Sequence, residues 1–186
     1  MKILKHQQNI QWLPQDNDVT LFISDELPPA HLCTSAYVFA FDGKAMLMAN
    51  LNRGVDIPGG HIDSGETPEA AMRREAKEET GAIIGAARLF AVQKITLKGE
   101  KPAGYSYPYP ESYQLMYFSS EFSLGEFSGD EDSFGAVLIS PEQAKDVPWL
   151  QKNREIYDYA LALVLGRHSK PESSKLHNSG DGDFKP

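Results

Sequence analysis

Three glutamates stand within five residues of one another in this chain: Glu75, Glu78 and Glu79. On an α-helix, spacings of three and four residues place side chains on one face, so these carboxylates should converge. Two of them are like charges one turn apart, and two fall in the last helical turn, where the helix dipole disfavours negative charge. A hard divalent cation such as Mg²⁺, which takes carboxylate oxygens as ligands, would offset both costs. The spacing therefore predicts a metal site.

A solvated charged surface is the alternative explanation for this helix. It has support from two favourable i,i+4 pairs, Glu69–Arg73 and Arg74–Glu78, each of which stabilises an isolated helix by about 0.2–0.5 kcal/mol. These pairs leave the like charges and the acidic last turn without compensation. A sequence that breaks two local rules in this way suggests function, so metal binding is the stronger interpretation.

The ends of the helix are marked by single residues. Thr67 is a suitable N-cap, Pro68 suits the first helical position, and Gly81 suits the left-handed residue that follows a helix. The glycine- and proline-rich segment 52–66 before the helix should be a loop. The carboxylates are thus expected on a helix that follows a loop and ends beside them.

Beyond the glutamates, the spacing of glycines and charged residues resembles the Nudix box. The matching residues are Gly60, Glu66, Arg74, Glu75, Glu78, Glu79 and Gly81. With each residue type at roughly 6–7% of positions, chance agreement is on the order of 10⁻⁹ per starting point. The family pattern asks for bulky aliphatic residues where this chain has Ala76 and Ala82. Those departures concern packing against the sheet rather than chemistry.

The resemblance implies an α/β fold, a Nudix-type α/β/α sandwich around a mixed β-sheet. It also implies hydrolysis of a diphosphate linkage in a nucleoside diphosphate derivative, by a water that is activated near Mg²⁺ or Mn²⁺ and attacks phosphorus. Glu75, Glu78 and Glu79 resemble the metal ligands, and in relatives the carbonyl group of Gly59 often joins them. Cations that bridge diphosphate oxygens would neutralise developing charge and lower the pKa of a bound water.

Two further box residues, Glu66 and Arg74, resemble residues that orient the ligand carboxylates, and they count as catalytic together with the three glutamates. The general base stays open between two places. The first and last of the three glutamates are the box candidates. Glu131 and Asp132, in the loop "SGDEDSFG", are the loop candidates. A solvated acidic loop explains this second pair at least as well.

Substrate recognition must come from outside the box. The segment 105–113 is the first candidate, because Tyr107 and Tyr109 could stack on a base while proline holds the loop extended. A plain loop at the sheet edge explains these tyrosines equally well. Part of the segment faintly resembles the signature of NADH diphosphatases, although the zinc-binding cysteines of many such enzymes are missing. Arg53 is the charged candidate for substrate binding, and His61 is either a phosphate contact or a solvated loop residue.

Composition limits the classes of partner. The formal net charge is −8 over 186 residues, which opposes long-range attraction to nucleic acid or anionic membrane. A small anionic nucleotide remains compatible, because a bound cation inverts the local sign. The lone Cys33 excludes an internal disulfide, and the longest apolar run, 159–165, is far shorter than the ~20 residues of a membrane span. We expect a cytoplasmic protein with a small-molecule nucleotide substrate, no nucleic-acid or membrane partner, and a homodimer as the candidate assembly.

The rest of the chain predicts strands that alternate with helices around one sheet. The predicted strands are 19–24, a hairpin over 34–51 that turns at Asp42-Gly43, 88–97, 112–122 and 135–140. Helices are predicted from Pro141 onward and over 153–165. The expected organisation is an N-terminal extension (1–30) that contains a strand, a Nudix hydrolase domain (31–166) and a polar, aperiodic tail (167–186) expected to be disordered. The extension could cover a sheet edge or build a dimer interface.

The same fold also serves other functions. A Nudix-fold sensor that binds nucleotides without turnover is the alternative, but such modules typically lose box carboxylates and this chain keeps them all. Processing of RNA 5′ ends would call for a basic channel along the RNA backbone, which the net charge of −8 disfavours. An isoprenoid diphosphate isomerase shares the fold, but its catalytic cysteine motif is not evident around Cys33.

Overall fold

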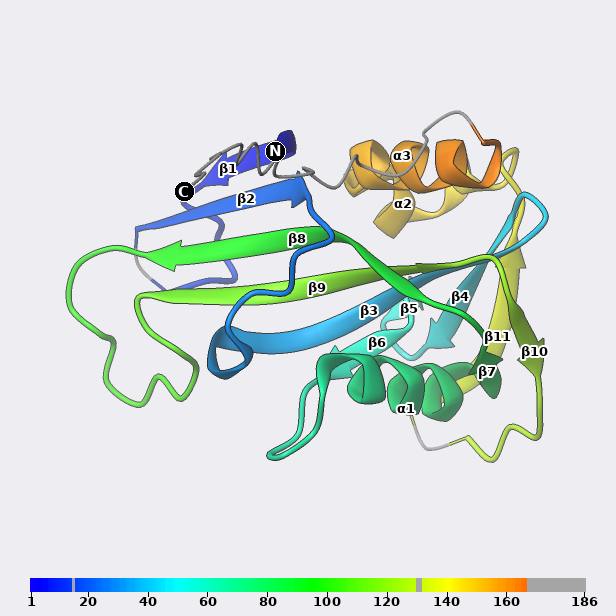
Figure 1. Cartoon of the computed structure of the whole chain (residues 1–186), viewed down its shortest axis with the longest axis horizontal. Coiled ribbons are helices and arrows are strands. Elements are labelled where there is room, and N and C mark those ends of the chain that lie inside the picture. Colours follow the sequence, from blue (N-terminus) through cyan, green and yellow to red (C-terminus); the bar gives the residue numbers. More distant parts are fainter. Residues whose placement is uncertain (15, 130–131, 167–186) are drawn as a thin grey trace, which may run out of the picture.

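The computed structural model describes residues 1–14, 16–129 and 132–166 (Figure 1). Its strands are β1 (Lys2–Gln8), β2 (Asn17–Ile23), β3 (Cys33–Asp42), β4 (Ala45–Leu51), β5 (Gly54–Asp56), β6 (Gly59–His61), β7 (Ala82–Ile84), β8 (Arg88–Leu97), β9 (Glu111–Ser119), β10 (Phe122–Leu124) and β11 (Ser133–Ile139). Its helices are α1 (Pro68–Thr80), α2 (Pro148–Lys152) and α3 (Arg154–Val164), with 3-10 turns at Ala30–Leu32 and Ala144–Asp146.

One large sheet organises the molecule, with the strand order β1-β2-β8-β9-β3-β4-β11. Outside this path β5 pairs with β4 and β6 with β3, while β7 and β10 form a separate two-stranded sheet. The pair β3–β9 is parallel and its neighbouring pairs β8–β9 and β3–β4 are antiparallel, so the sheet is mixed. Helix α1 covers one face, and α2 with α3 covers the other (Figure 1). The predicted α/β/α sandwich is confirmed.

Alternation along β3 shows how the two layers are built. Val38 and Ala40 belong to the apolar cluster shared with α1. Phe39 and Phe41 belong to the cluster on the opposite face, which contains Tyr157 of α3. All of these side chains are at most 1% exposed. Because consecutive strand residues point to opposite faces, the central strand is covered on both sides, as its continuous apolar sequence predicted.

Two local predictions are confirmed closely. β8 spans the predicted residues 88–97. The hairpin between β3 and β4 turns at Gly43, whose φ of +56° is the left-handed conformation that glycine adopts without strain. Local turn chemistry, which can be recognised in the sequence, therefore sets where β3 ends and β4 begins.

The prediction of a helix from Pro141 onward is wrong. The chain there forms a turn, and α2 begins only at Pro148. Backbone and side-chain hydrogen bonds between Ser140 and Gln143 close this turn, with the Gln143 side chain accepting from the Ser140 N–H at 3.0 Å. Proline suits a first helical position and a turn equally well, so the residue type alone did not separate the two.

The strand predicted over 112–122 is also wrong in its extent, because it divides into β9 and β10. The Ser119 hydroxyl group donates toward the carbonyls of Ala86 and Glu121, both at 2.8 Å, and this redirects the chain. β1 is an element that the sequence did not predict, since its residues are mostly polar and exposed. The segment 52–66, predicted as a loop, contains the short strands β5 and β6, which pair with β4 and β3. The tail predicted over 167–186 lies outside the described residues.

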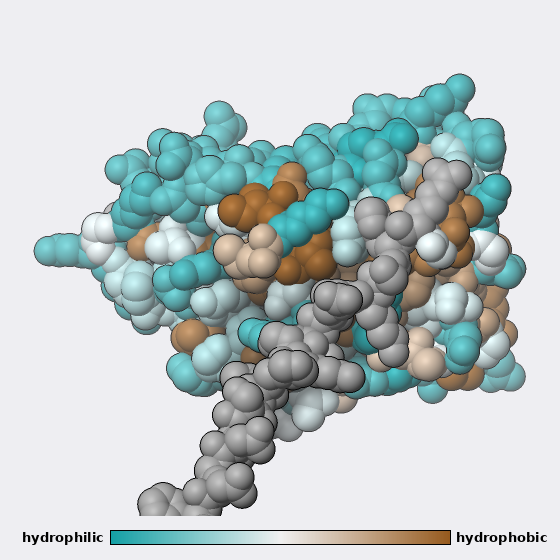
Figure 2. Space-filling model, turned by 45° about the horizontal axis from the view of Figure 1, so that its top comes forward, coloured by the Kyte–Doolittle hydropathy of each residue, from teal (hydrophilic) through white to brown (hydrophobic). Residues whose placement is uncertain are grey.

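The surface combines charged and apolar regions. On the face that Figure 2 turns toward the viewer, hydrophobic residues gather in a compact patch surrounded by hydrophilic ones. In the part of the chain that the structure describes, none of the helices combines the length and the apolar composition that a membrane span requires.

Candidate functional site

Helix α1 presents the three glutamates, and its ends are fixed by the residues that the sequence singled out. The Thr67 hydroxyl group accepts from the Ala70 N–H at 3.2 Å, and Pro68 occupies the first helical position. Gly81 follows the helix with φ of +72° and donates its N–H to the Lys77 carbonyl at 2.8 Å. The helix therefore ends where the sequence predicted, and its acidic face adjoins β6.

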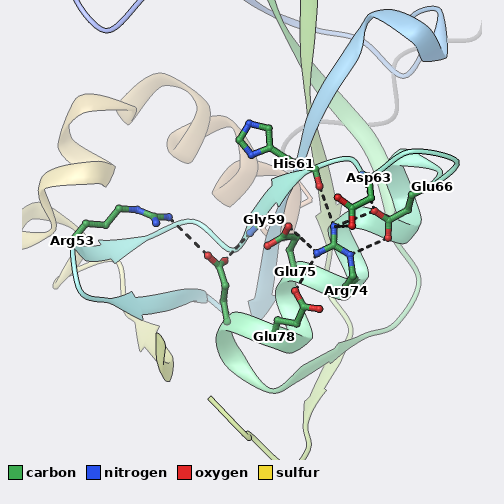
Figure 3. Close-up of polar contacts among 9 residues, drawn as sticks. Arg53, Gly59, His61, Asp63, Glu66, Arg74, Glu75 and Glu78 are labelled. Atoms are coloured by element: carbon green, nitrogen blue, oxygen red, sulfur yellow. Dashed lines mark hydrogen bonds and ion pairs between the residues drawn. The ribbon is translucent and has the colours of Figure 1, made fainter. Parts of the chain in front are cut away.

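Arg74 is the centre of a hydrogen-bond network that joins the loop before α1 to the helix (Figure 3). Its Nε and Nη2 atoms donate to the two carboxylate oxygens of Glu66, each at 3.1 Å. Nη2 also donates to the His61 carbonyl at 3.0 Å, and Nη1 donates to Glu75 at 2.9 Å and to Glu78 at 3.1 Å. The planar guanidinium thus holds three carboxylates in fixed relative positions.

The electrostatic effect of this network is mutual. The hydrogen bonds from Arg74 hold the pKa of the Glu66 carboxyl below its usual range, and the backbone N–H of Asp63 adds to the effect. Glu66, followed by Glu75, raises the pKa of the Arg74 guanidinium above its usual value. Glu66 and Arg74 therefore both stay charged at neutral pH. Arg74 therefore orients the carboxylates and does not transfer protons.

Glu79 has a different environment from its neighbours. Its Oε2 atom accepts from the Gly59 N–H at 3.0 Å, and Oε1 lies 3.8 Å from Nη2 of Arg53. Burial raises the pKa of Glu79 to about 7 and the charge of Glu75 adds to the rise, while Gly59 and Arg53 oppose it. The protein groups around this carboxylate supply too little positive charge to keep it fully ionised. A divalent cation would supply that charge.

Each of the two glycines of β6 allows the close approach of a different neighbouring element. A Cβ on Gly60 would lie 2.5 Å from the Glu75 carboxyl carbon. A Cβ on Gly59, whose φ is +141°, would lie 2.4 Å from the Ala36 carbonyl oxygen. Gly60 thus makes room for a site carboxylate, whereas Gly59 makes room for the neighbouring strand β3. On the other side of the helix, Ala76 is fully buried against the sheet.

Two of the three glutamates line one large cavity. Its volume is about 980 Å³, and Glu75, Glu79, Gly59, Gly60 and Arg53 are among its lining residues. Glu78 does not line it, because this side chain is 56% exposed and hydrogen-bonded to Arg74. Among the described residues, no group of three or more His, Cys, Asp or Glu side chains is already arranged to hold a metal ion.

The donor set nevertheless fits a hard cation. Glu75 and Glu79 offer carboxylate oxygens at one end of the cavity, and Glu78 lies one turn from Glu75 on the same helix. Glu78 could join them by exchanging its hydrogen bond with Arg74 for a metal ligand bond. Carboxylates on one helical face are the ligands that Mg²⁺ takes from proteins.

Of the two tyrosines predicted to bind substrate, Tyr107 lines a cavity and Tyr109 does not. Tyr107 stacks on His61 with ring centroids 5.6 Å apart, and its hydroxyl group lies 2.8 Å from Nε2 of His61. Both rings line a second cavity of about 370 Å³ beside the first. The Tyr109 hydroxyl group instead donates to the Gly99 carbonyl, and the ring packs on a small apolar cluster of β2 and β8. Tyr109 lines neither of these cavities.

Arg53 and the acidic loop complete the set of predicted residues. Arg53 lines the large cavity and donates from Nε to Asp56 at 3.0 Å, next to Glu79. Asp132 accepts from the Asn52 side chain at 2.8 Å and lines neither cavity. Glu131 lies outside the described residues. Of the candidates for general base that the structure describes, the box glutamates adjoin the cavity and Asp132 does not.

Sequence reasoning missed the far wall of the cavity. Trp12, Gln93, Gln114 and Trp149 line it, and they come from the N-terminal turn, β8, β9 and α2. Gln93 and Gln114 had a usable signal, since each is a polar residue directly next to an apolar run of its strand, LFAV in β8 and LMYF in β9. Trp12 had none, because nothing near it in the sequence indicates which part of the sheet its turn approaches.

Comparison with known proteins identifies the family. The model of the NUDIX domain matches residues 29–160, and the chain therefore belongs to the Nudix family. A MutT-like protein of Streptomyces ambofaciens is 34% identical over 74 residues, which are 39% of this chain and 48% of that protein. The ADP-ribose pyrophosphatase of Bacillus subtilis is 28% identical over 112 residues, which are 60% of this chain and 55% of that protein. The chain thus spans about half the length of these two curated relatives.

A solved structure shows the same fold. The crystal structure of the Bacillus subtilis pyrophosphohydrolase BsRppH matches with a TM-score of 0.55 and 24% identity. The match covers 80% of this chain and 89% of that one. At this level of identity the likeness establishes the arrangement of strands and helices and leaves the substrate open.

Proposed function

We propose that this chain is a metal-dependent hydrolase that cleaves a diphosphate linkage in a nucleoside diphosphate derivative by attack of water at phosphorus. The observation that carries the proposal is the arrangement around Arg74. This residue holds Glu66, Glu75 and Glu78 together while Glu75 and Glu79 line a large cavity. An arrangement of carboxylates beside a cavity suits cation-assisted phosphate chemistry.

Mg²⁺ or Mn²⁺ is the proposed cofactor, with Glu75, Glu78, Glu79 and the Gly59 carbonyl group as ligands. When bound, such a cation neutralises charge on the diphosphate and lowers the pKa of a coordinated water. The chain's own residues orient the carboxylates through Arg74. Arg53, on the cavity wall, adds a positive charge that could contact a phosphate.

The box glutamates are the preferred candidates for general base. Glu75 and Glu79 line the cavity, and without metal, burial raises the pKa of Glu79 to about 7, close to the value that suits a base at neutral pH. Asp132 is tied to Asn52 away from both cavities. A bound metal would change the pKa of any carboxylate that serves as its ligand. As general base we therefore prefer a glutamate with one oxygen that does not bind the metal.

The direct test is a panel of substrates assayed with Mg²⁺, with Mn²⁺ and with chelator. ADP-ribose, nucleotide sugars, NADH, dinucleoside polyphosphates and normal or oxidised nucleoside triphosphates form the panel. ADP-ribose belongs in it because one relative is named as an ADP-ribose pyrophosphatase. Metal-dependent release of a nucleoside monophosphate or of phosphate would support the proposal and name the substrate.

The sensor alternative has a distinct result in the same panel. If every substrate stayed intact while one raised the melting temperature of the protein, binding without turnover would replace hydrolysis. The proposed partner in both cases is a small-molecule nucleotide, in the cytoplasm that the single cysteine favours. A homodimer remains a proposal, which light scattering of the purified protein would test.

A further inference from the structure

The large cavity changes character with distance from the box. Away from the carboxylates its floor is the sheet surface, formed by residues such as Leu21, Phe39, Gln93, Gln114 and Met116. The charged residues and the histidine among its described lining residues are Arg53, Asp56, His61, Glu75 and Glu79, in the box and the β4–β6 segment beside it; Tyr37 of β3 adds a phenol group. A neutral part of a ligand therefore fits the far end, while its anionic part faces the box.

Two amide side chains form the polar centre of this far end. Gln93 of β8 and Gln114 of β9 are directly opposite in register, and Nε2 of Gln93 donates to Oε1 of Gln114 at 2.7 Å. The bond uses one donor and one acceptor. A carbonyl group of one amide and an amino group of the other remain available, and this holds whichever way the two amides are oriented. The pair thus offers a donor and an acceptor side by side, half-buried among apolar residues.

An exposed tryptophan stands on the wall beside this pair. Trp12 is 63% exposed, yet it lines both cavities, as Gln114 does. Its turn is well anchored, because the fully buried Asn17 accepts from the Ile10 N–H at 2.9 Å and donates to the Ile10 carbonyl at 3.2 Å. Bonds of this kind fix the backbone of the turn next to Trp12, so a ligand that stacks on the indole ring has to order little more than that side chain.

We infer that Trp12 and the Gln93–Gln114 pair form a subsite for the heteroaromatic base of the nucleotide. Trp12 supplies a face for stacking, and the amide pair supplies hydrogen bonds to the edge of the base. The inference rests on the proposed function in taking a nucleotide as the ligand, and it deepens that function by assigning the residues that recognise the base. The N-terminal extension is thereby part of the binding site.

The chemistry of the subsite favours a base over other neutral groups. An acyl chain would cover the amide pair and leave its free donor and acceptor without partners, which is costly in a half-buried site. A sugar would offer hydroxyl groups but no flat π-face for the indole. A nucleobase has both a flat face and an edge on which donors and acceptors alternate.

Binding of nucleoside monophosphates to the full chain tests the assignment without requiring turnover. AMP, GMP, CMP and UMP are titrated by calorimetry, in Mg²⁺ and in chelator, with ribose 5-phosphate as the probe that lacks a base. We expect at least one monophosphate to bind about tenfold more tightly than ribose 5-phosphate, the size of one stacking contact. Equal or undetectable binding of all five compounds would overturn the subsite.

Variants then separate the contribution of stacking on Trp12 from that of hydrogen bonds to the glutamine pair. Trp12→Ala should lower the affinity for the most tightly bound monophosphate by about tenfold and leave the affinity for ribose 5-phosphate unchanged. Trp12→Phe should restore most of the lost affinity. Gln114→Leu should remove the differences in affinity among the four bases. Phe134→Ala and Gln8→Leu are the matched controls, since Phe134 is 60% exposed on β11, the Gln8 amide donates to Asp18 at 2.8 Å, and neither lines the cavities.

The outcomes also separate this inference from the proposed function. If Trp12→Ala and Gln114→Leu bind every monophosphate as the unchanged protein does, the subsite is overturned, whatever the hydrolysis panel shows. If they weaken or level binding as expected while no substrate is hydrolysed, the subsite stands and the hydrolase proposal fails. Circular dichroism and the melting temperature of each variant establish that a changed affinity is not a loss of folding.

Discussion

The two ends of the large cavity are built on different principles. At the box end, charged residues within one short segment are locked together by Arg74, which bonds to Glu66, Glu75 and Glu78. At the far end, uncharged residues from separate strands and from the N-terminal turn share a surface, on which Gln93 is hydrogen-bonded to Gln114. The first arrangement suits chemistry that varies little within a family. The second can change residue by residue, and we expect it to set specificity.

The largest expected effect comes from removing a carboxylate at the box end. Glu79→Gln should reduce kcat/KM by more than about 100-fold, since even the groups that support metal ligands are each worth about 10–100-fold. The melting temperature in chelator should hold or rise, because repulsion from Glu75 is relieved. Steady-state kinetics and thermal melting measure the two effects.

The matched control for that variant is Glu69→Gln on the same helix, whose carboxylate pairs with Arg73 at 2.7 Å. It should leave kcat/KM unchanged. A marked loss of metal-free stability in Glu79→Gln would show that the glutamate cluster is structural, and would remove the distinction between the two ends of the cavity.

Adjacent arginines offer the next test. Arg74→Lys should lower kcat/KM and Mn²⁺ affinity by about 10–100-fold, because an ammonium group cannot reproduce the bidentate bonds to Glu66. Arg73→Lys should instead lower stability, since Arg73 donates to the Ile84 and Gly85 carbonyls. Electron paramagnetic resonance of Mn²⁺ and thermal melting separate the two variants. The same profile for both would refute the special role of Arg74.

We expect alanine substitutions at the two neighbouring glycines of β6 to have different effects. Gly60→Ala should lower Mn²⁺ affinity about tenfold with little change in melting temperature, because the added methyl group displaces the Glu75 carboxylate. Gly59→Ala should destabilise the fold by about 1–3 kcal/mol, because its φ is +141° and its Cβ meets the Ala36 carbonyl. Chemical denaturation measures the second effect. Equal metal affinity in Gly60→Ala and the unchanged protein would contradict this account of Gly60.

The smallest expected effect is a dependence of stability on pH. Burial gives Glu79 a pKa of about 7 in the folded protein, above its usual 4.5, so proton binding favours the folded state. That contribution is complete below about pH 4.5 and is lost as the pH rises through 7. In chelator, the free energy of unfolding should therefore fall between about pH 5 and pH 8, measured by urea titration.

Glu79→Gln should flatten the slope of the free energy of unfolding against pH. Saturating Mg²⁺ should oppose the fall in stability as the pH rises, because the cation competes with the proton for the same carboxylate. An unchanged slope in Glu79→Gln would assign the titration to other groups. The far end of the cavity contains no comparable carboxylate among its described lining residues, so Trp12→Ala should keep the slope.

Features that depend on neighbours along the chain were predictable. Thr67, Gly43 and Gly81 act through local backbone conformation, and their roles as cap, turn and helix terminator are confirmed. The turn that stands in place of a helix at Pro141 shows the limit of this approach, because proline suits both structures. The roles of the box residues in metal binding stay predictions, to be tested by the variants above.

The amino-acid sequence was enough to place three carboxylates on one helical face after a glycine-rich segment, because helical spacing and capping are local properties. The tertiary fold, and no local pattern, buries Glu79 against Gly59 and leaves Glu78 exposed. It also decided that Trp12 and Gln114, about a hundred residues apart in the sequence, line one cavity. Both outcomes depend on pairing between distant strands, namely β3 with β6, β2 with β8 and β8 with β9, which side-chain periodicity within one strand does not specify.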